Sequence, residues 1–372
     1  MTSTVTELLY VARDPAWAPW AVTYFFLIGL SYGALALSLP GIVFGATRWR
    51  NASRMALLGA LITGLAAPVA LLSDLGNPGR FLNFYLHPQA SSWMSWGAFF
   101  LPVYVGLLLL YAWAALAPEM RARIDEGGVF APARRLLGGD ERPALVKIFG
   151  LLALAGAMLV ALYTGAEVMV ARARPLWGTS LLPFQFVATA FAGAAGMTIV
   201  LNRLFGDDAV ATESLLNRAL ATSLVFVAAI GALWFAIALL LPTSIESQAL
   251  AQVANSSVWR LNALWLGLAV AIPFVIAFAK PVGSGWFTGL LALNAAWMFR
   301  WTIFIGGQSI PKTGAGWYSH PLELGPEGLL GVIGTAGLVL FIAIALTSLL
   351  GWPREASSDA ADAARPSSVL RA

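Results

Sequence analysis

The residues of this sequence that could do chemistry are acidic, basic and phenolic side chains at the ends of long apolar segments. Asp74 and Arg80 lie six positions apart in Asp-Leu-Gly-Asn-Pro-Gly-Arg, directly after an apolar run. The glycines and the proline between them end a helix there. Because only 11% of the residues are charged, a charged pair beside a membrane-length segment indicates an ion partner, a watery pocket or a ligand rather than contact with lipid.

Similar groups recur further along the chain. Glu167 stands near the end of another apolar segment with Tyr163 one helical turn before it, and Tyr24 follows Trp20 by one turn in the first such segment. Tyrosine and carboxylate side chains can hydrogen-bond a polar head group and exchange protons with water. The candidate binding residues are therefore Tyr24, Asp74, Arg80, Tyr163 and Glu167. The sequence predicts no metal site.

Composition places the chain in a membrane. Of its 372 residues 59% are hydrophobic, and the mean hydropathy is +0.78, well above the range of water-soluble proteins. The absence of Cys excludes thiolate ligation of an iron–sulfur cluster. The two His residues, His87 and His320, fall in loops, so we expect no haem. The net charge of +4 is typical of basic cytoplasmic loops rather than of nucleic-acid binding.

Hydropathy predicts an all-α integral membrane bundle of about nine spans, each able to cross about 30 Å of hydrocarbon. A count of eight stays open because Pro273 and Pro281 interrupt the seventh and eighth segments. We expect one bundle over 1–350, a cytoplasmic linker over 118–143 and a disordered cytoplasmic tail over 351–372. The predicted spans are Pro19–Gly45, Arg54–Leu75, Ser92–Leu116, Leu145–Ala171, Ser180–Phe205, Ser214–Leu241, Arg260–Ala279, Gly285–Ile305 and Glu327–Leu350.

The Lys and Arg residues predict the orientation. With the N-terminus outside, fifteen of them fall on the inner side and six on the outer side, as the positive-inside rule requires. The ionisable groups near the spans then gather at the outer end, and the middle of the spans holds only neutral polar residues. This asymmetry favours a small amphiphile that dissolves in lipid and reacts at the outer interface. A quinone, with its flat polar head and apolar tail, fits that description.

Simpler interpretations stay open for each residue. Asp74 and Arg80 form either a loop-fixing ion pair or part of a binding site, and Glu167 either pairs with Arg172 or Arg174 or serves a ligand. The two tyrosines are either packing residues at the interface or ligand contacts. The two histidines are expected to be plain surface residues.

Several motifs resemble the polysulfide reductase membrane-subunit (NrfD-like) family. The most specific is the Asp74-Leu-Gly-x-Pro-x-Arg80 turn, followed by Ser92-x-x-Ser-Trp-Gly97 at the start of the next span. Weaker matches are Tyr163-Thr-Gly165, Trp177 with Leu182-Pro183, and Arg300 with Gly306-Gly-Gln308. The resemblance covers roughly Trp20 to Leu350.

The resemblance implies a haem-free membrane anchor that oxidises or reduces a quinone, either menaquinone or ubiquinone. Its expected partners are an iron–sulfur electron-transfer subunit on the outer face, a molybdopterin catalytic subunit and membrane lipid. Tyr163 would then hydrogen-bond the quinone head, with Asp74 and Arg80 shaping the outer pocket. Some relatives have a His on the first span where this chain has none, so we assign the proton acceptor to Glu167.

Together these patterns predict a multi-pass protein of a bacterial inner membrane, with its N-terminus outside and its C-terminus in the cytoplasm. It would react with quinone without carrying out the chemistry of the terminal substrate. Two other classes stay open: a secondary transporter or proton-translocating protein, and a purely structural anchor.

Overall fold

The computed structural model describes Trp17 and residues 19–171, 173–206, 209–254, 256–310 and 322–352. Within these residues the chain is helical and contains no strand. Nine of the described helical segments are long and apolar enough to cross a membrane, which confirms the predicted all-α polytopic fold. His320 and the predicted tail from residue 353 onward lie outside the described residues.

The boundaries follow the predicted spans closely, with α4 as the main exception because it continues beyond Leu116. The long helices are α1 Pro19–Ile42, α2 Arg50–Asp74, α4 Trp93–Ala122, α6 Pro143–Met169, α7 Leu182–Phe205, α8 Ala209–Leu240, α10 Ser257–Ala279, α11 Gly285–Trp301 and α13 Leu329–Leu350. The short elements are η1 Thr47–Trp49, η2 Pro78–Arg80, α3 Asn83–Leu86, η3 Ile124–Glu126, α5 Ala131–Leu137, α9 Ile245–Val253, η4 Thr302–Gly306 and α12 Gly307–Ser309.

Local sequence signals set several helix starts. Ser92 caps α4, Ser244 caps α9 and Ser256 caps α10, each side-chain oxygen accepting a hydrogen bond from the backbone N–H three residues on, because those first N–H groups have no partner within the helix. Pro143 begins α6, where its missing N–H costs nothing. Pro273 lies inside α10 without ending it, so the seventh span is continuous.

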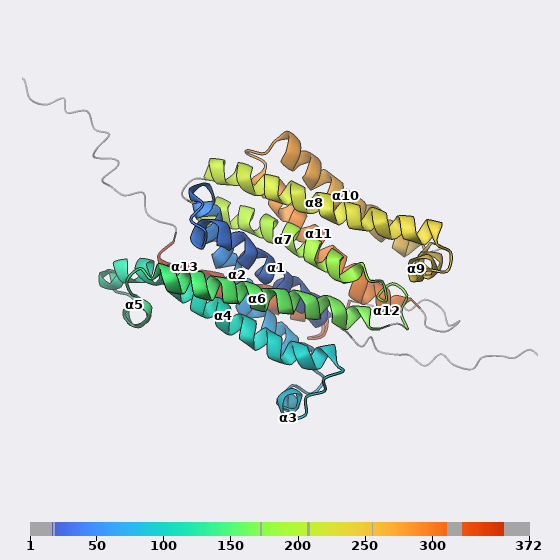
Figure 1. The fold of residues 1–372 in the computed structure, drawn as a ribbon, viewed down its shortest axis with the longest axis horizontal. Coiled ribbons are helices and arrows are strands. Elements are labelled where there is room, and N and C mark those ends of the chain that lie inside the picture. Colours follow the sequence, from blue (N-terminus) through green and yellow to red (C-terminus); the bar gives the residue numbers. More distant parts are fainter. Residues whose placement is uncertain are drawn as a thin grey trace, which may run out of the picture.

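The helix α1 forms the centre of the bundle. It packs against α2, α6, α7, α11 and α13, and most of its side chains are buried. In Figure 1 the α4–α6 pair lies on one flank of this centre and the α8–α10 pair on the other. The outer helices α8, α10 and α13 expose large apolar side chains, as expected for surfaces that face lipid.

Small residues bring the central helices close together. A Cβ added to Gly33 of α1 would lie 2.9 Å from the Cβ of Ala194 in α7, and one added to Gly196 of α7 would lie 2.8 Å from the carbonyl oxygen of Gly289 in α11. In an apolar solvent such close contacts hold helices together by dispersion. The glycine pattern of the sequence therefore marks helix packing.

Polar side chains inside the bundle bond to one another or to the backbone. The Ser31 hydroxyl lies 2.7 Å from the Tyr104 hydroxyl and donates to the Ala60 carbonyl, and Ser38 pairs with Tyr111 at 3.1 Å. Thr63 and Thr198 donate to the carbonyl four residues back. These bonds satisfy groups that would otherwise be costly to bury.

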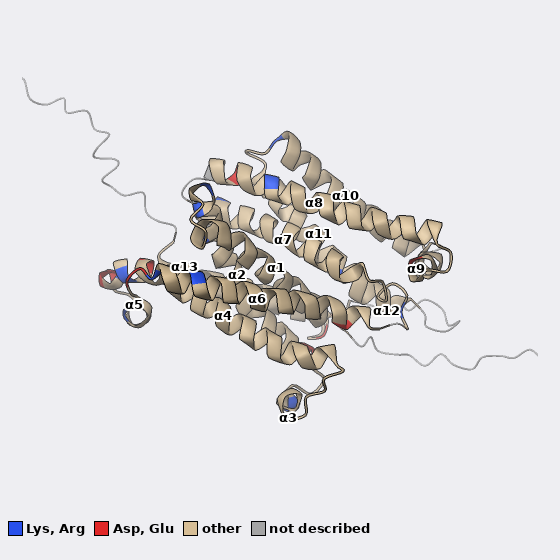
Figure 2. Cartoon of the chain, viewed as in Figure 1, with Lys and Arg blue, Asp and Glu red and all other residues tan. Residues whose placement is uncertain are grey.

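The two ends of the bundle differ in charge. Described Lys and Arg residues gather where α5 lies, called here the α5 end, as Figure 2 shows. The opposite end, where α2 finishes at Asp74 and α6 at Met169, is called here the Asp74 end. Its described cations outside the bundle interior are Arg80 in η2, Arg174 between α6 and α7, and Arg260 in the first turn of α10.

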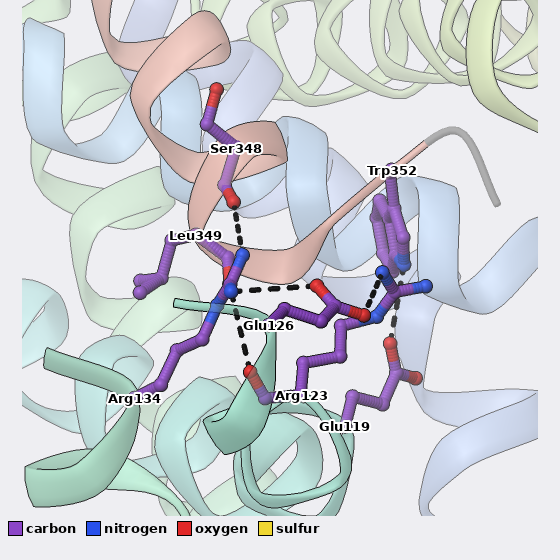
Figure 3. A network of polar contacts seen from close by, with 7 residues as sticks. All are labelled: Glu119, Arg123, Glu126, Arg134, Ser348, Leu349 and Trp352. Carbon is purple, nitrogen blue, oxygen red and sulfur yellow. Dashed lines mark hydrogen bonds and ion pairs between the residues drawn. The ribbon is translucent and has the colours of Figure 1, made fainter. Parts of the chain in front are cut away.

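The 118–143 segment is folded and closes the α5 end (Figure 3). From α5, the Arg134 guanidinium donates to the carbonyl oxygens of Leu349 and Ser348 at 2.9 Å, at the C-terminus of α13, and it contacts Glu126 at 3.4 Å. Beyond it, Gly351 adopts a positive φ of 63° that ends α13, a position that favours glycine. A cation at a helix C-terminus is stabilised by the helix dipole, so this segment clamps the last span.

Replacing Arg134 with Ala should therefore lower the free energy of unfolding by about 2–4 kcal/mol, because three charge-assisted hydrogen bonds to backbone carbonyls are lost. Thermal unfolding of the purified protein in detergent measures the effect. The matched control is Arg135→Ala on the same helix, whose exposed side chain should contribute less than about 0.5 kcal/mol. Equal destabilisation by both changes would contradict the clamp.

Candidate functional site

Two tyrosine hydroxyls meet inside the bundle below the Asp74 end. The hydroxyl oxygens of Tyr24 in α1 and Tyr163 in α6 are 2.6 Å apart, and the side chains are 0% and 3% exposed. One hydroxyl donates to the other, which uses one of the two available protons. The second hydroxyl proton stays free to donate to a third group. The pair is thus a hydrogen-bond donor fixed in an apolar setting.

Two glycines make room for this pair. A Cβ added to Gly97 of α4 would lie 2.2 Å from the ring of Tyr163, and one added to Gly165 would lie 2.5 Å from Pro183 of α7. The ring of Tyr163 therefore packs against α4 at Gly97, and α6 touches the start of α7. The Ser-Trp-Gly, Tyr-Thr-Gly and Leu-Pro motifs, far apart in sequence, meet at this point.

Carboxylates connect the tyrosine pair to the Asp74 end. Glu167 lies one turn beyond Tyr163 on α6 and is half-buried, and its carboxylate lies near both tyrosine side chains. Asp74, at the last residue of α2, interacts electrostatically with Glu167 in turn. The structure thus brings four of the five predicted binding residues into one series, from the surface to the core.

A pocket of about 540 Å³ opens beside Glu167. Three indole side chains, those of Trp17, Trp93 and Trp177, are among its lining residues, and Arg174 lines it as well. The hydroxyls of the tyrosine pair do not line this pocket and lie deeper in the bundle, behind Glu167. A flat ligand in the pocket would therefore meet indole rings and a carboxylate first.

Arg174 is the cation of this pocket. It donates to the Gly307 carbonyl at 2.8 Å and lies 5.0 Å from the centre of the Trp177 ring, a cation–π contact. Partial burial lowers the pKa of its guanidinium, which nevertheless stays charged because arginine titrates far above neutral pH. It forms no ion pair with Glu167 within the described part of the chain, and Arg172 lies outside that part.

A π-helical turn, η4, holds Trp177 in the wall of this pocket. The wider turn leaves the Ile303 carbonyl able to accept a hydrogen bond from the Trp177 indole at 2.7 Å. The Gln308 side chain then holds Trp17 through both backbone groups, accepting from its N–H at 3.0 Å and donating to its carbonyl at 2.7 Å. Trp17 stacks on Trp177 with ring centres 5.1 Å apart. Sequence reasoning missed the roles of Trp17 and Arg174, for which their position beside a span end was the only signal.

Arg300 is buried deeper in α11, with 1% exposure. Its guanidinium donates to the Thr189 hydroxyl at 2.6 Å and to the Phe186 carbonyl at 3.0 Å. It forms no ion pair with any described carboxylate. This Arg therefore points into the bundle and joins α11 to α7.

Arg80 lies apart from the other predicted residues. It is exposed in η2 and lines a separate surface hollow with Phe84, His87 and Ser95. No ion pair between Arg80 and Asp74 is among those formed by described residues. His87 is exposed as expected. Asp74 thus lies near Glu167 and the tyrosine pair, whereas Arg80 belongs to the neighbouring surface hollow.

The fold and the site define a polytopic helical membrane protein whose internal polar series ends at one side of the bundle. The profile of the family described as "Polysulphide reductase, NrfD" matches residues 11–312, so this chain belongs to the NrfD family of polysulphide reductase. This confirms the resemblance seen in the turn after α2 and in the Tyr163 and Arg300 motifs.

Named relatives align with half or more of the chain at 25–29% identity. This protein is similar to a subunit of the tetrathionate reductase of Salmonella typhimurium, with 29% identity over 93% of this protein and 95% of that subunit. It is also similar to one of the polypeptides of the polysulfide reductase of Wolinella succinogenes, with 25% identity over 78% and 94% of the two proteins. A subunit of the selenate reductase of Mesobacillus selenatarsenatis matches about half of each protein at 28% identity.

The contact between Gly97 and Tyr163 gives a test of this geometry. Gly97→Ala should displace the phenol ring, because its new methyl group would lie 2.2 Å from a ring atom. We expect a loss of about 1–3 kcal/mol in unfolding free energy from overpacking and a changed tyrosine environment in ultraviolet resonance Raman spectra. Gly106→Ala on the same helix is the control, since a Cβ there meets nothing within 4 Å. An unperturbed Raman spectrum of Gly97→Ala would refute the packing.

Proposed function

We propose that this protein is the membrane subunit of an oxidoreductase complex and that it oxidises or reduces a quinone near the Asp74 end. The observation that carries the proposal is the buried Tyr24–Tyr163 hydroxyl pair, which lies one helical turn from Glu167, a residue that lines a pocket with three indole side chains. Quinone chemistry moves two electrons and two protons and needs both a hydrogen-bond donor and a proton-exchanging group. The site supplies these two groups next to each other.

The chemistry of the residues fits a quinone head. The free hydroxyl proton of the tyrosine pair can be donated to a carbonyl oxygen, and the indole rings of Trp17 and Trp177 offer flat apolar surfaces. A quinone head bound on the Asp74-end side of the tyrosines would lie between the two hydroxyls and the mouth of the pocket that Glu167 lines. The tail would lie toward lipid, where apolar surface costs nothing.

Proton exchange falls to the carboxylates in this proposal. Glu167 is half-buried between the tyrosines and the pocket, so it can pass a proton between the head group and water. Asp74 stands next in the series, at the end of α2. Tyr24 and Tyr163 hold the oxygen atoms in place through their mutual bond. Proton uptake and release would then occur on one side of the membrane.

Electrons would pass between the quinone and an iron–sulfur subunit, and from there to or from a molybdopterin catalytic subunit. The sequence has no Cys to hold a cluster of its own, and the relatives carry the names of reductase components. The partner would dock at the Asp74 end, where the Arg80 hollow offers a cation among exposed aromatic residues. A quinone site at that end keeps the transfer distance short.

The same proposal gives the location and orientation. The described cations gather at the α5 end, and the positive-inside rule assigns that end to the cytoplasm. The protein would lie in a bacterial inner membrane with its N-terminus outside and its C-terminus inside.

Tyr163→Phe tests the function directly. Removing the hydroxyl leaves Tyr24 without its partner and the head group with one hydrogen bond fewer, so quinol oxidation or quinone reduction should slow about fivefold to tenfold. Steady-state turnover with menadiol and decylubiquinol, in membranes that contain the assembled complex, measures the rate. Tyr111→Phe is the control, because that buried tyrosine bonds Ser38 near the α5 end. Unchanged turnover in an intact complex would remove the role assigned to Tyr163.

Substitutions of Asp74 and Arg80 should have different effects on turnover and on partner retention. Asp74→Asn removes a charge that acts on Glu167, so we expect slower turnover with the complex still assembled. Arg80→Gln changes only the surface hollow and should weaken retention of the partner subunits during purification while leaving quinone-analogue binding to the protein unchanged. Fluorescence titration of the analogue and gel filtration of the complex distinguish the two. Loss of the partner subunits in Asp74→Asn, or weaker quinone-analogue binding in Arg80→Gln, would contradict the roles given to these two residues.

A further inference from the structure

A further pocket lies against η4, whose residues Thr302 and Ile303 line it. Helices α7, α8, α10 and α11 enclose it, and α9 covers it at the Asp74 end. Its volume is about 330 Å³, and its lining is almost entirely apolar, with Ile230, Trp234 and Leu266 among the side chains. The cover is held firmly, because the Thr179 hydroxyl donates to Glu246 of α9 at 2.6 Å.

Polarity changes along this pocket. Arg260 and Asn262 line it in the first two turns of α10, whereas Leu266 and Phe299 line it deeper. Six residues of helix separate Arg260 from Leu266, which corresponds to about 9 Å. No carboxylate of the described residues pairs with the Arg260 guanidinium. The pocket thus has a cation at its mouth and an apolar interior.

We propose that this pocket binds one anionic phospholipid, with its phosphate beside Arg260 and one acyl chain inside the cavity. A phosphate matches this cation, because charge-assisted bonds from Arg to phosphate are strong and a basic residue at a membrane surface attracts anionic lipid. A quinone head is uncharged and gains nothing comparable from Arg260. An acyl tail matches the aliphatic and aromatic walls.

The bound acyl tail would touch the outer side of η4. Ile303 and Thr302 line the pocket, and the Ile303 carbonyl accepts the Trp177 hydrogen bond. The lipid would therefore support the wall that holds Trp17 and Trp177 in place. The proposal does not depend on what the tyrosine pair binds.

Native mass spectrometry of the full-length protein in detergent tests the proposal, with phosphatidylglycerol and phosphatidylcholine of identical acyl composition. We expect phosphatidylglycerol to be retained preferentially. Arg260→Gln should lower its retention about fivefold, the loss expected for one basic residue at a membrane surface. Arg218→Gln is the matched control, since this Arg is exposed on α8 and does not line the pocket.

A filling variant tests the cavity itself. A Cβ at Gly231, which lines the pocket, meets nothing within 4 Å, so Gly231→Leu should fold and exclude both lipids. Gly267→Leu is the control, because that glycine is equally open but does not line the pocket. The proposal would be overturned if the unaltered protein retained both lipids equally, or if Arg260→Gln or Gly231→Leu left lipid retention unchanged. Preferential binding of added menaquinone, or the loss of a protein dimer in Gly231→Leu, would also overturn it.

Discussion

The whole structure depends on one constraint: polar groups in the bundle must find partners inside it, because the surrounding lipid offers none. The central helix α1 shows how this is met. Tyr24, Ser31 and Ser38 recur along its length, and each bonds a tyrosine of α4 or α6. These bonds fix the rotation and the depth of α1 against its neighbours. Of the three tyrosine contacts, the one at Tyr24 involves two phenols and lies close to a carboxylate, which makes it chemically different from the others.

Close helix contacts make this bonding possible. Gly33 and Gly196 let α1, α7 and α11 approach to backbone contact, and Gly97 lets the Tyr163 ring lie on α4. The same close packing leaves Arg300 within reach of Thr189 and the Phe186 carbonyl. The buried guanidinium is thus solvated by the protein, at a point where α7 and α11 meet.

The two ends of the bundle use charge differently. At the α5 end, Arg134 bonds the last carbonyls of α13, and Arg54 pairs with Glu119 at 2.9 Å, so the cations there fasten helices together. At the Asp74 end, Asp74 and Glu167 stand near each other and near the tyrosines. Two acids near each other and near two phenols form a group that can exchange protons. This contrast favours a functional role for the Asp74 end.

Much of the fold could be predicted from the sequence because hydropathy responds to lipid directly. The nine spans followed from apolar length, even where Pro273 interrupts one, since neighbouring helices tolerate a proline within a long apolar segment. The site was only partly predictable. Tyr163 and Glu167 stood out because they are four residues apart on one span, whereas Arg174, Trp17 and the π-helical turn carry no pattern that marks their contacts.

The sequence by itself determined the membrane class, a bundle of about nine spans, the family motifs and the residue types that could handle protons, because these depend on composition and on local spacing. Only the tertiary structure decided that Tyr24 meets Tyr163, that Gly97 makes room for the ring, and that Arg80 lies apart from the series that Asp74 joins. The physical reason is that these contacts join helices far apart in the sequence. Their geometry follows from helix rotation and packing, which no local pattern encodes.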